Sequence, residues 1–261
     1  MPENCIEFRG ITKVYNPGTV HENCLFQDFS LSIRKGSFVS VVGSNGSGKT
    51  SLLNILCGTI PIEAGSIILD GQDITQLREY HRYERMGRVY QNPAMGTCAS
   101  MTILENLAMA DNKGKHFGLT RGTDRKRISA YRDMLAPLGL GLEDKLGIQV
   151  GLLSGGQRQT LALLMATMNP IDFLILDEHT AALDPKTAEI VMELTGRVIQ
   201  EKHLTTLMVT HNLRHAVSYG DRLIMMHAGG IVLDKEGEDK KALKVEDLLT
   251  LFNSISIECG N

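Results

Sequence analysis

Residues 38–57 are FVSVVGSNGSGKTSLLNILC, and this stretch decides the fold. Its first part, 38–42, is an apolar run as long as a buried strand, and a glycine-rich loop follows it directly. Residues 51–57 then carry apolar side chains at helical spacing. Similar short apolar runs recur between helical stretches, at 173–176, 206–209 and 223–226. This alternation of strand and helix predicts an α/β fold whose central sheet is parallel.

The glycine-rich loop matches the phosphate-binding pattern GxxxxGK[ST], with a strand before it and a helix after it. Glycines let backbone N–H groups turn toward phosphate oxygens, and the helix start adds partial positive charge there. The Lys49 ammonium can reach the β- and γ-phosphates, and the Thr50 hydroxyl can ligate Mg²⁺. A glycine-rich turn without a ligand does not explain these two side chains. The residues predicted to bind a nucleotide are Gly43, Ser44, Asn45, Gly46, Ser47, Gly48, Lys49, Thr50 and Ser51.

An acidic pair, Asp177 and Glu178, directly follows the apolar run 173–176. If that run is a central strand, both carboxylates should lie at the carboxyl edge of the sheet, beside the phosphate-binding loop. Asp177 is predicted to hold Mg²⁺, directly or through water. Glu178 is predicted to act as general base on the attacking water. Taken alone, the pair also fits a solvated acidic turn, but the phosphate-binding loop upstream favours the catalytic interpretation.

Composition excludes several classes of protein. Of the 261 residues, 43% are hydrophobic and 22% are charged, which are ordinary values for a chain that buries a core. The formal net charge of -3 gives no reason to expect a nucleic-acid partner. No apolar run approaches the roughly 18 residues that span a bilayer, and the N-terminal sequence does not resemble a signal peptide. We therefore expect a cytoplasmic protein that serves a membrane only through other subunits.

The cysteines favour reduced thiols. There are five, an odd number, and no CxxC pair occurs, which argues against both a disulfide framework and a zinc site. They are Cys5, Cys24, Cys57, Cys98 and Cys259.

The middle of the chain, from about residue 102 to 146, has little strand character and carries apolar side chains at helical spacing. This predicts a helical lobe inserted into the α/β core. Its basic run, 121–127, is either a solvated helix face or a contact with a partner or lipid head groups. Near the end, 236–241 is strongly charged and expected to be exposed, and 245–252 has the pattern of an amphipathic helix.

Residues 153–157, LSGGQ, resemble the signature motif of the ATP-binding cassette (ABC) ATPases. Other elements of that family follow in the family's order. Gln91, just past a strand, resembles the Q-loop glutamine, and Asp184 in AALD resembles the D-loop aspartate. His211 ends a strand as the switch histidine does, and Tyr15 resembles the aromatic residue that stacks on adenine. The resemblance covers almost the whole chain.

The resemblance implies roles for these residues. Gln91 would contact Mg²⁺ and the attacking water, and His211 would contact the γ-phosphate and hold Glu178 in line. It also implies an ATP-sandwich homodimer, in which the signature motif of one subunit caps the ATP held by the other. The residues expected to do so are Ser154, Gly155, Gly156 and Gln157, together with Asp184. His211 could also be an ordinary histidine at a strand end, and Tyr15 an ordinary core residue.

The family's fold implies a single ABC ATPase domain over 1–261. Its P-loop NTPase (RecA-like) core, with a mostly parallel sheet, would comprise 1–91 and 160–235. An antiparallel β subdomain would form at the N-terminus, and 92–159 would form the helical signature subdomain. Residues 236–261 would add a charged segment and a helix.

One position departs from the family pattern. ABC proteins commonly carry proline directly after the catalytic glutamate, whereas this chain has His179, in DEHTAALD at 177–184. An imidazole there could titrate near neutrality and alter the turn. With GTCASMT at 96–102, the segment is similar to one group of bacterial import ATPases. That group is associated with tryptophan- or tyrosine-type substrate-binding lipoproteins.

Three functions fit this resemblance. The favoured one is the ATPase subunit of a bacterial importer of a small solute such as an amino acid. It would bind transmembrane permease subunits at the inner face of the membrane and be served indirectly by a substrate-binding lipoprotein. The second is a lipoprotein-release, efflux or division-associated ATPase, which the long stretch after Tyr15 also resembles. The third, a non-transport ABC protein acting on ribosomes or DNA, is disfavoured by the single cassette and the acidic charge.

Overall fold

The computed structural model describes residues 3–115 and 122–258 of the chain. The chain divides into two compact units. The first, which we call the P-loop unit, joins Met1–Tyr83 to His203–Asn261. The second, the signature unit, is Glu84–Lys202. The division of one domain into the ranges given above stays a prediction.

The P-loop unit contains a four-stranded antiparallel sheet in the order β2-β1-β4-β5. Its strands are β1 (Asn4–Tyr15), β2 (Asn23–Arg34), β4 (Ala64–Leu69) and β5 (Gln72–Asp73). Along β2, buried and exposed residues alternate from Phe29 to Ile33, because successive side chains point to opposite faces of the sheet. β1 and β2 extend well beyond their apolar centres, since they pair from Asn4↔Arg34 to Tyr15↔Asn23.

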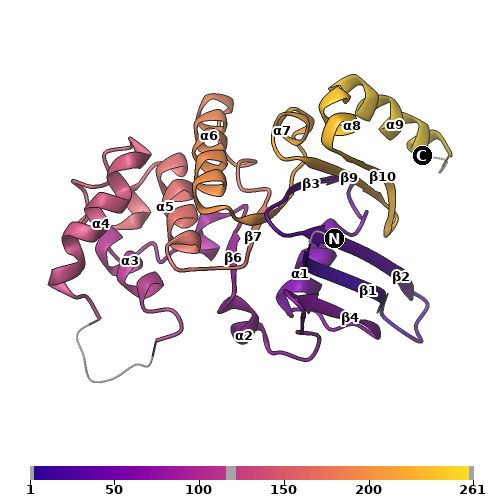
Figure 1. Ribbon diagram of the computed structural model, residues 1–261, viewed down its shortest axis with the longest axis horizontal. Helices are drawn as coiled ribbons and strands as arrows, with labels where there is room; N and C mark the ends of the chain where they lie inside the picture. The colour runs from indigo at the N-terminus through magenta and orange to yellow at the C-terminus, as the bar shows by residue number, and fades with distance from the viewer. Residues whose placement is uncertain (1–2, 116–121, 259–261) are drawn as a thin grey trace. The chain divides into compact units, whose positions relative to one another are not determined.

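The second sheet of this unit holds β10, β9, β3 and β8 side by side. These strands are β3 (Phe38–Gly43), β8 (Thr205–Val209), β9 (Arg222–His227) and β10 (Gly230–Glu236). β3 is parallel to both of its neighbours, and only β10 runs antiparallel, so the predicted mostly parallel sheet is confirmed. The helices are α1 (Lys49–Cys57), α2 (Glu79–Tyr83), α7 (Leu213–Ser218), α8 (Gly237–Ala242) and α9 (Val245–Glu258). Figure 1 shows α7, α8 and α9 on one side of this sheet and α1 on the other.

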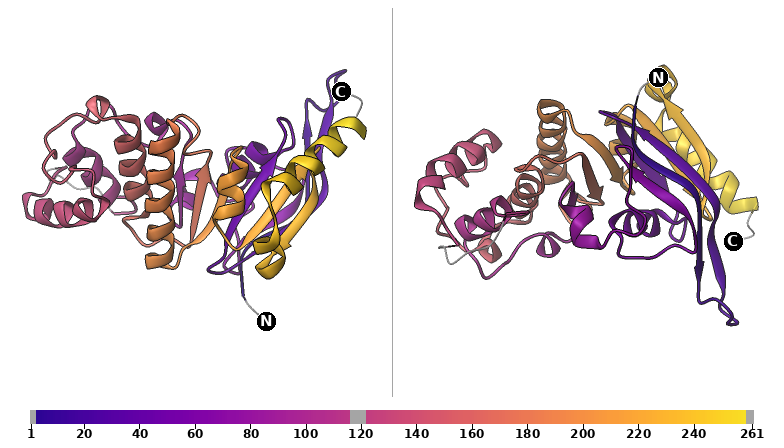
Figure 2. Two further views of the ribbon diagram at one scale, coloured as in Figure 1. Left: turned by 90° about the horizontal axis from the view of Figure 1, so that it is seen from above. Right: turned by 60° about the horizontal axis from the view of Figure 1, so that its bottom comes forward.

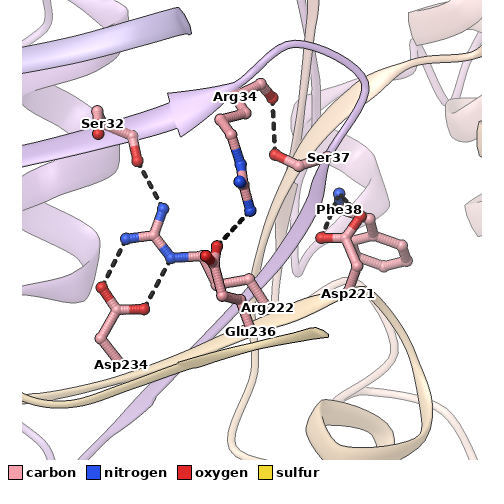
Figure 3. A network of polar contacts seen from close by, with 8 residues as sticks. All are labelled: Ser32, Arg34, Ser37, Phe38, Asp221, Arg222, Asp234 and Glu236. Atoms are coloured by element: carbon pink, nitrogen blue, oxygen red, sulfur yellow. Dashed lines mark hydrogen bonds and ion pairs between the residues drawn. The ribbon is translucent and has the colours of Figure 1, made fainter. Parts of the chain in front are cut away.

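A polar network joins the two sheets of the P-loop unit (Figure 3). Arg222, which begins β9, donates two hydrogen bonds to Asp234 on β10, at 2.7 and 2.6 Å. Its third hydrogen bond, of 2.7 Å, goes to the carbonyl of Ser32 on β2. Arg34 on β2 also pairs with Glu236 on β10. The antiparallel sheet is thereby tied to β9 and β10 of the second sheet.

The signature unit is mostly helical. Two strands, β6 (Met86–Val89) and β7 (Phe173–Asp177), pair in parallel. Around them lie α3 (Ile103–Asp111), α4 (Ile128–Leu135), α5 (Gly155–Thr167) and α6 (Pro185–Lys202), with short 3-10 helices at Pro93–Met95, Arg125–Arg127, Ala136–Leu138 and Val150–Leu152. Figure 2 shows α5 and α6 side by side. The range 102–146, predicted to be helical, contains α3 and α4 and no strand among its described residues.

The helices of the signature unit share one apolar core. Among its members are Ile103 and Leu107 of α3, Tyr131 and Leu135 of α4, and Leu161 of α5. Removing these side chains from water stabilises the unit, at roughly 25 cal/mol for each Å² of apolar surface buried. This core therefore holds the start of α5, where the signature motif lies, against α3 and α4.

The prediction that 236–241 is exposed is wrong at one residue. Lys240, on α8, is 3% exposed, and its ammonium donates to the carbonyls of Val217, Tyr219 and Gly220. These carbonyls lie at and just beyond the end of α7, where a cation is favoured by the helix dipole. Burial lowers the pKa of Lys240. The charge pattern alone does not distinguish this capping lysine from its solvated neighbours.

The remaining expectations concern thiols, charge and membranes. Four cysteines, Cys5, Cys24, Cys57 and Cys98, form no disulfide among the described residues, while Cys259 lies outside them. Residue 121 of the basic run 121–127 also lies outside them, and Arg127 pairs with Asp111 at 2.9 Å. Within 3–115 and 122–258, no helix has both the length and the apolar character needed to cross a membrane.

Candidate nucleotide site

The P-loop joins β3 to α1 and is shaped by its glycines. At Gly43 a Cβ atom would lie 2.3 Å from the carbonyl oxygen of Met226, so no larger residue fits there. Gly48, immediately before α1, has a φ of 105°, a conformation that favours glycine, and a Cβ there would lie 3.0 Å from the ring of Phe26. The loop therefore makes the tight turn that a main-chain phosphate site before a helix requires.

The Lys49 side chain folds back over this loop. It is 5% exposed, and its ammonium lies 2.7 Å from the carbonyl oxygen of Gly43 and 2.9 Å from that of Ser44. The Ser47 hydroxyl lies 3.4 Å away. Three oxygens of its own loop thus lie within 3.4 Å of the buried ammonium. A phosphate entering the loop would accept charge-assisted hydrogen bonds from this cation, which are about twice as strong as neutral ones.

The turn between β9 and β10, which is distant in sequence, contacts the P-loop through Gly229. The Gly229 N–H, between β9 and β10, donates to the Ser47 carbonyl at 3.1 Å. Gly229 has a φ of 78°, and a Cβ atom there would lie only 1.6 Å from the carbonyl oxygen of Leu25. Sequence reasoning missed Gly229. The glycine pair at 229–230 after an apolar run was the available signal, but it predicts a turn and not a contact with the P-loop.

Tyr15 lies beside the start of α1. Its hydroxyl donates to the Ser51 hydroxyl at 2.9 Å, and its ring is partly exposed. The ammonium of Lys13 lies 5.3 Å from the ring centroid and is itself paired with Glu63 at 2.8 Å. The P-loop unit therefore brings the aromatic ring to the helix that the P-loop begins. Its contact with adenine stays a prediction.

His211 lies at the same edge of the sheet as the P-loop. It follows β8 by two residues, and the Thr210 N–H donates to the Val41 carbonyl of β3 at 3.1 Å. Asn212 then caps α7, because its side chain accepts from the N–H groups of two residues in the first turn. His211 is exposed between these two fixed points. Both β3 and β8 thus end where a phosphate group would lie if the P-loop bound one.

In the signature unit, Asp177 and Gln91 share one sheet edge. Val89 of β6 is in register with Leu176 of β7, so residues that follow these two positions lie beyond the carboxyl ends of both strands. Gln91 is exposed there, and Asp177 accepts a hydrogen bond of 2.6 Å from Arg88. A sheet edge with a carboxylate and an amide offers the oxygen donors that Mg²⁺ prefers.

Sequence reasoning missed Arg88. Its side chain is 7% exposed, and its guanidinium lies 4.7 Å from the centroid of the Tyr90 ring. The ion pair with Asp177 is therefore largely buried, which makes it costly to break by removing one partner. A single charged residue inside a short apolar strand was the available signal, because buried charges are nearly always paired.

Glu178 stands at a strained position. Its φ of 48° places it in the left-handed region, which costs a residue with a Cβ on the order of 1 kcal/mol. The turn is closed by the Ala181 N–H, which donates to the Glu178 carbonyl at 2.9 Å. The next residue, His179, is 2% exposed. Strain of this kind persists only where the surrounding contacts fix the backbone, and it concentrates at functional sites.

The signature motif begins α5 with a capping box. The Ser154 hydroxyl accepts from the Gln157 N–H at 3.3 Å, and the Gln157 side chain accepts from the Ser154 N–H at 3.2 Å. A Cβ on Gly156 would lie 2.3 Å from the Thr187 methyl group on α6, and one on Gly155 would lie 3.1 Å from Leu183. Gly155 and Ser154 remain exposed. The helix start therefore presents a hydroxyl and N–H groups to solvent.

Asp184 caps the start of α6 in a similar way. Its carboxylate accepts from the Thr187 N–H at 3.1 Å, and hydrogen bonds from Thr187 hold the pKa of Asp184 below its ordinary value. The starts of α5 and α6 therefore touch through Gly156 and Thr187. The signature unit thus brings the signature motif and the D-loop aspartate to adjacent helix ends.

Comparisons with known proteins agree with these features. The chain matches a family model described as ABC transporter over residues 26–181, more than half of its length. It is 47% identical over 247 residues to the tyrosine transport ATP-binding protein of Clostridioides difficile (strain R20291), covering 95% of this chain and 98% of that protein.

Two further relatives are longer. The spermidine/putrescine import ATP-binding protein PotA of Haemophilus influenzae (strain 86-028NP) is 33% identical over 235 residues, covering 89% of this chain and 59% of that protein. The methionine import ATP-binding protein MetN of Corynebacterium efficiens is 30% identical over 234 residues, covering 88% and 62%. The chain therefore spans 59% and 62% of the lengths of these two relatives.

Solved structures share the fold. A nucleotide-free ATP-binding cassette from an ABC transporter superposes with a TM-score of 0.78 at 23% identity, covering 99% of this chain and 100% of that one. A dimeric ATP-binding cassette in a post-hydrolysis state, bound to ADP and phosphate, superposes with a TM-score of 0.73 at 28% identity, covering 88% and 98%.

Proposed function

The chain belongs to the ABC transporter family, and from this premise we propose that it is the ATP-hydrolysing subunit of a bacterial importer for an amino acid of the tyrosine type. The observation that carries the substrate class is the 47% identity to a tyrosine transport ATP-binding protein over nearly the whole of both chains. Identity to the polyamine and methionine import proteins is 33% and 30%. A subunit of this kind supplies energy, while subunits in the membrane contact the solute.

ATP binding is assigned to the P-loop unit. The main-chain N–H groups of 43–51 and the start of α1 suit the β- and γ-phosphates, and Lys49 would exchange its carbonyl contacts for phosphate oxygens. The Tyr15 ring would stack on adenine, a role supported by its place beside α1 and by its partly exposed face. His211 would contact the γ-phosphate from the end of β8.

Magnesium and the attacking water are assigned to oxygen donors. Mg²⁺ in nucleotide sites usually keeps several waters and takes one or two carboxylates together with phosphate oxygens. The Thr50 hydroxyl, the Gln91 amide and the Asp177 carboxylate have this chemistry. The bound ion would neutralise charge on the phosphates, and Asp177 would then share its carboxylate between Arg88 and the ion or its waters.

Glu178 is proposed as the general base. Its carboxylate would accept a proton from the attacking water while that water adds to the γ-phosphorus, and the bond to the β-phosphate oxygen breaks. A base must be held within hydrogen-bond reach of the water, which the closed turn at Glu178 favours. His211 would keep water and γ-phosphate in line with it.

Two copies of the chain would share each ATP. The start of α5, with Ser154, Gly155, Gly156 and Gln157, exposes Ser154 and Gly155 and would suit phosphate oxygens of a nucleotide held by a second copy. The dimeric structure of a related cassette with ADP and phosphate supports this arrangement. Loss of the γ-phosphate would weaken the interface and open the dimer, and that motion would drive the transporter.

The expected partners are transmembrane permease subunits, which would hold the chain at the inner face of the membrane, and a substrate-binding lipoprotein that reaches it only through them. The test is an affinity purification of the tagged chain from detergent-solubilised host membranes, with mass spectrometry of the partners. We expect a multi-span permease and a binding lipoprotein. A partner with a large extracytoplasmic domain and no binding protein would redirect the proposal to release or efflux.

Substrate class needs a second measurement. The captured complex is reconstituted in proteoliposomes, and ATP-dependent uptake of labelled tyrosine is compared with that of methionine and putrescine. Uptake of tyrosine that competes with other aromatic amino acids would support the proposal. Uptake of methionine or putrescine instead would leave the ATPase assignment in place and remove the tyrosine class.

A further inference from the structure

His179 occupies a buried position directly after the proposed base. Its ring Nε2 lies 3.2 Å from the Thr195 hydroxyl oxygen on α6. Both side chains are enclosed, at 2% and 0% exposure. A buried polar contact between two elements is costly to lose, because each group left without its partner has already given up its hydrogen bonds to water.

The direction of this hydrogen bond follows from the other contact of Thr195. The hydroxyl of Thr195 donates its only proton to the Val191 carbonyl, at 2.7 Å and one helical turn earlier. Its oxygen can therefore only accept from His179, so the imidazole carries a proton on Nε2. The chain of donors runs from His179 to Thr195 to the backbone of α6. This contact fixes the position of the ring Nε2 against α6.

The anchored residue adjoins a strained one. Glu178 adopts a φ of 48°, and a residue with a Cβ leaves that region readily unless its neighbours fix the backbone. His179 is the first residue after it, and its ring is fixed to a helix 16 positions further along the chain. The turn from Asp177 to Ala181 is thus held at its centre by a side chain as well as by the main-chain hydrogen bond that closes it.

We infer that the hydrogen bond from His179 to Thr195 positions the Glu178 carboxylate to accept a proton from the attacking water, with His179 and Thr195 acting as positioning residues. The inference rests on the proposed role of Glu178 as general base. In physical terms, the contact with α6 fixes the direction in which the Glu178 carboxylate points. The same helix packs against the signature motif through Thr187 and Gly156, so one rigid element supports both the base and the capping motif.

The test removes the hydroxyl while keeping the shape of the side chain. Thr195→Val should lower kcat for ATP about ten-fold with KM changed less than about two-fold, because a displacement of the base by a fraction of an ångström lowers only the chemical step. Thr195→Ser restores the hydroxyl and should return kcat to within about two-fold of the parent. A Thr195→Val enzyme with the parent kcat would overturn the inference.

A matched control exists on the neighbouring helix. Thr167 on α5 is 2% exposed and donates to the Leu163 carbonyl at 2.8 Å, the same helical back-bond as in Thr195. Thr167→Val therefore removes a buried hydroxyl of the same kind and should leave kcat unchanged. An equal loss in both variants would show that burying a valine in a helix is the cause, and it would also overturn the inference.

A second pair of variants, at His179, tests the same contact in case the Thr195→Val protein does not fold. His179→Gln keeps an Nε2 donor at about the same reach, whereas His179→Leu removes it, so only the second should lower kcat. The double variant His179→Leu with Thr195→Val should lose no more than about the larger single loss, as expected for two groups that act through one contact. Additive losses would contradict the proposed contact.

A failure of the base assignment is measured separately. Glu178→Gln and the parent are assayed in the same series. If Glu178→Gln keeps normal turnover, the proposed base is wrong and the inference falls with it. If Glu178→Gln is inactive and Thr195→Val matches the parent, the base stands and only the positioning role is removed.

Discussion

The P-loop and the acidic end of β7 each hold a charged group, but they hold it by different means. The Lys49 ammonium donates hydrogen bonds to main-chain carbonyls of its own loop, at 2.7 and 2.9 Å. The Asp177 carboxylate accepts a hydrogen bond of 2.6 Å from Arg88, a side chain of another strand. These contacts of Lys49 lie within residues 43–49. The arrangement at Asp177 depends on contacts across the fold, so single substitutions far from it should affect it more strongly.

The largest effect is expected at the base itself. Glu178→Gln keeps the size of the side chain but cannot accept a proton, so kcat for ATP hydrolysis should fall about 1000-fold while ATP binding is retained. Phosphate release and ATP titration measure the two quantities. Glu193→Gln, at an exposed position on α6, is the control and should behave like the parent. Turnover by Glu178→Gln at the parent rate would contradict the assignment.

The next effect concerns stability at the acidic end. Arg88→Leu leaves the Asp177 carboxylate largely buried without this partner, and the free energy of unfolding should fall by about 3 kcal/mol. The control is Arg85→Leu in the same unit. Arg85 pairs with Asp172, but both side chains are about one-third exposed, so its removal should cost less than about 1 kcal/mol.

Denaturant unfolding curves of the two variants make this comparison. Equal losses from Arg88→Leu and Arg85→Leu would show that burial does not distinguish the two ion pairs. In that case the acidic end would be no more dependent on distant side chains than the protein surface is.

These differences explain what the sequence could predict. The P-loop residues and the order of strands follow from local patterns, because main-chain geometry depends on glycines and on periodicity nearby. Gly229, Arg88 and Thr195 could not be placed, since each acts on a residue 16 or more positions away or on another strand. The prediction that Lys240 is exposed was wrong for the same reason. Long-range contacts follow from topology, which a local pattern does not encode.

A smaller effect is expected at the P-loop lysine. Lys49→Ala should weaken ATP binding about 30-fold, because a charge-assisted contact to phosphate contributes on the order of 2 kcal/mol. Isothermal titration with ATP and Mg²⁺ measures the change. Lys35→Ala removes an exposed ammonium elsewhere in the P-loop unit and should bind ATP like the parent. Unchanged affinity in Lys49→Ala would contradict the nucleotide assignment of the loop.

The smallest effects test whether the P-loop unit also depends on a side-chain network. Arg222 is mostly buried, binds Asp234 through two nitrogens and reaches Ser32, so Arg222→Lys should lower the free energy of unfolding by about 1 kcal/mol, since an ammonium cannot reproduce this fork. Arg34 and Glu236 are about half exposed, and Arg34→Lys should change it by less than about 0.5 kcal/mol.

Both variants leave the P-loop intact, and ATP affinity should match the parent in each, because the loop is held by its own main chain and by Gly229. Denaturant unfolding and ATP titration of the same preparations separate the two quantities. If Arg222→Lys weakened ATP binding as strongly as Lys49→Ala, the P-loop would depend on the network that joins its two sheets. The P-loop and the acidic end of β7 would then both depend on side-chain contacts. They would differ only in how far apart in the sequence the contacting residues lie.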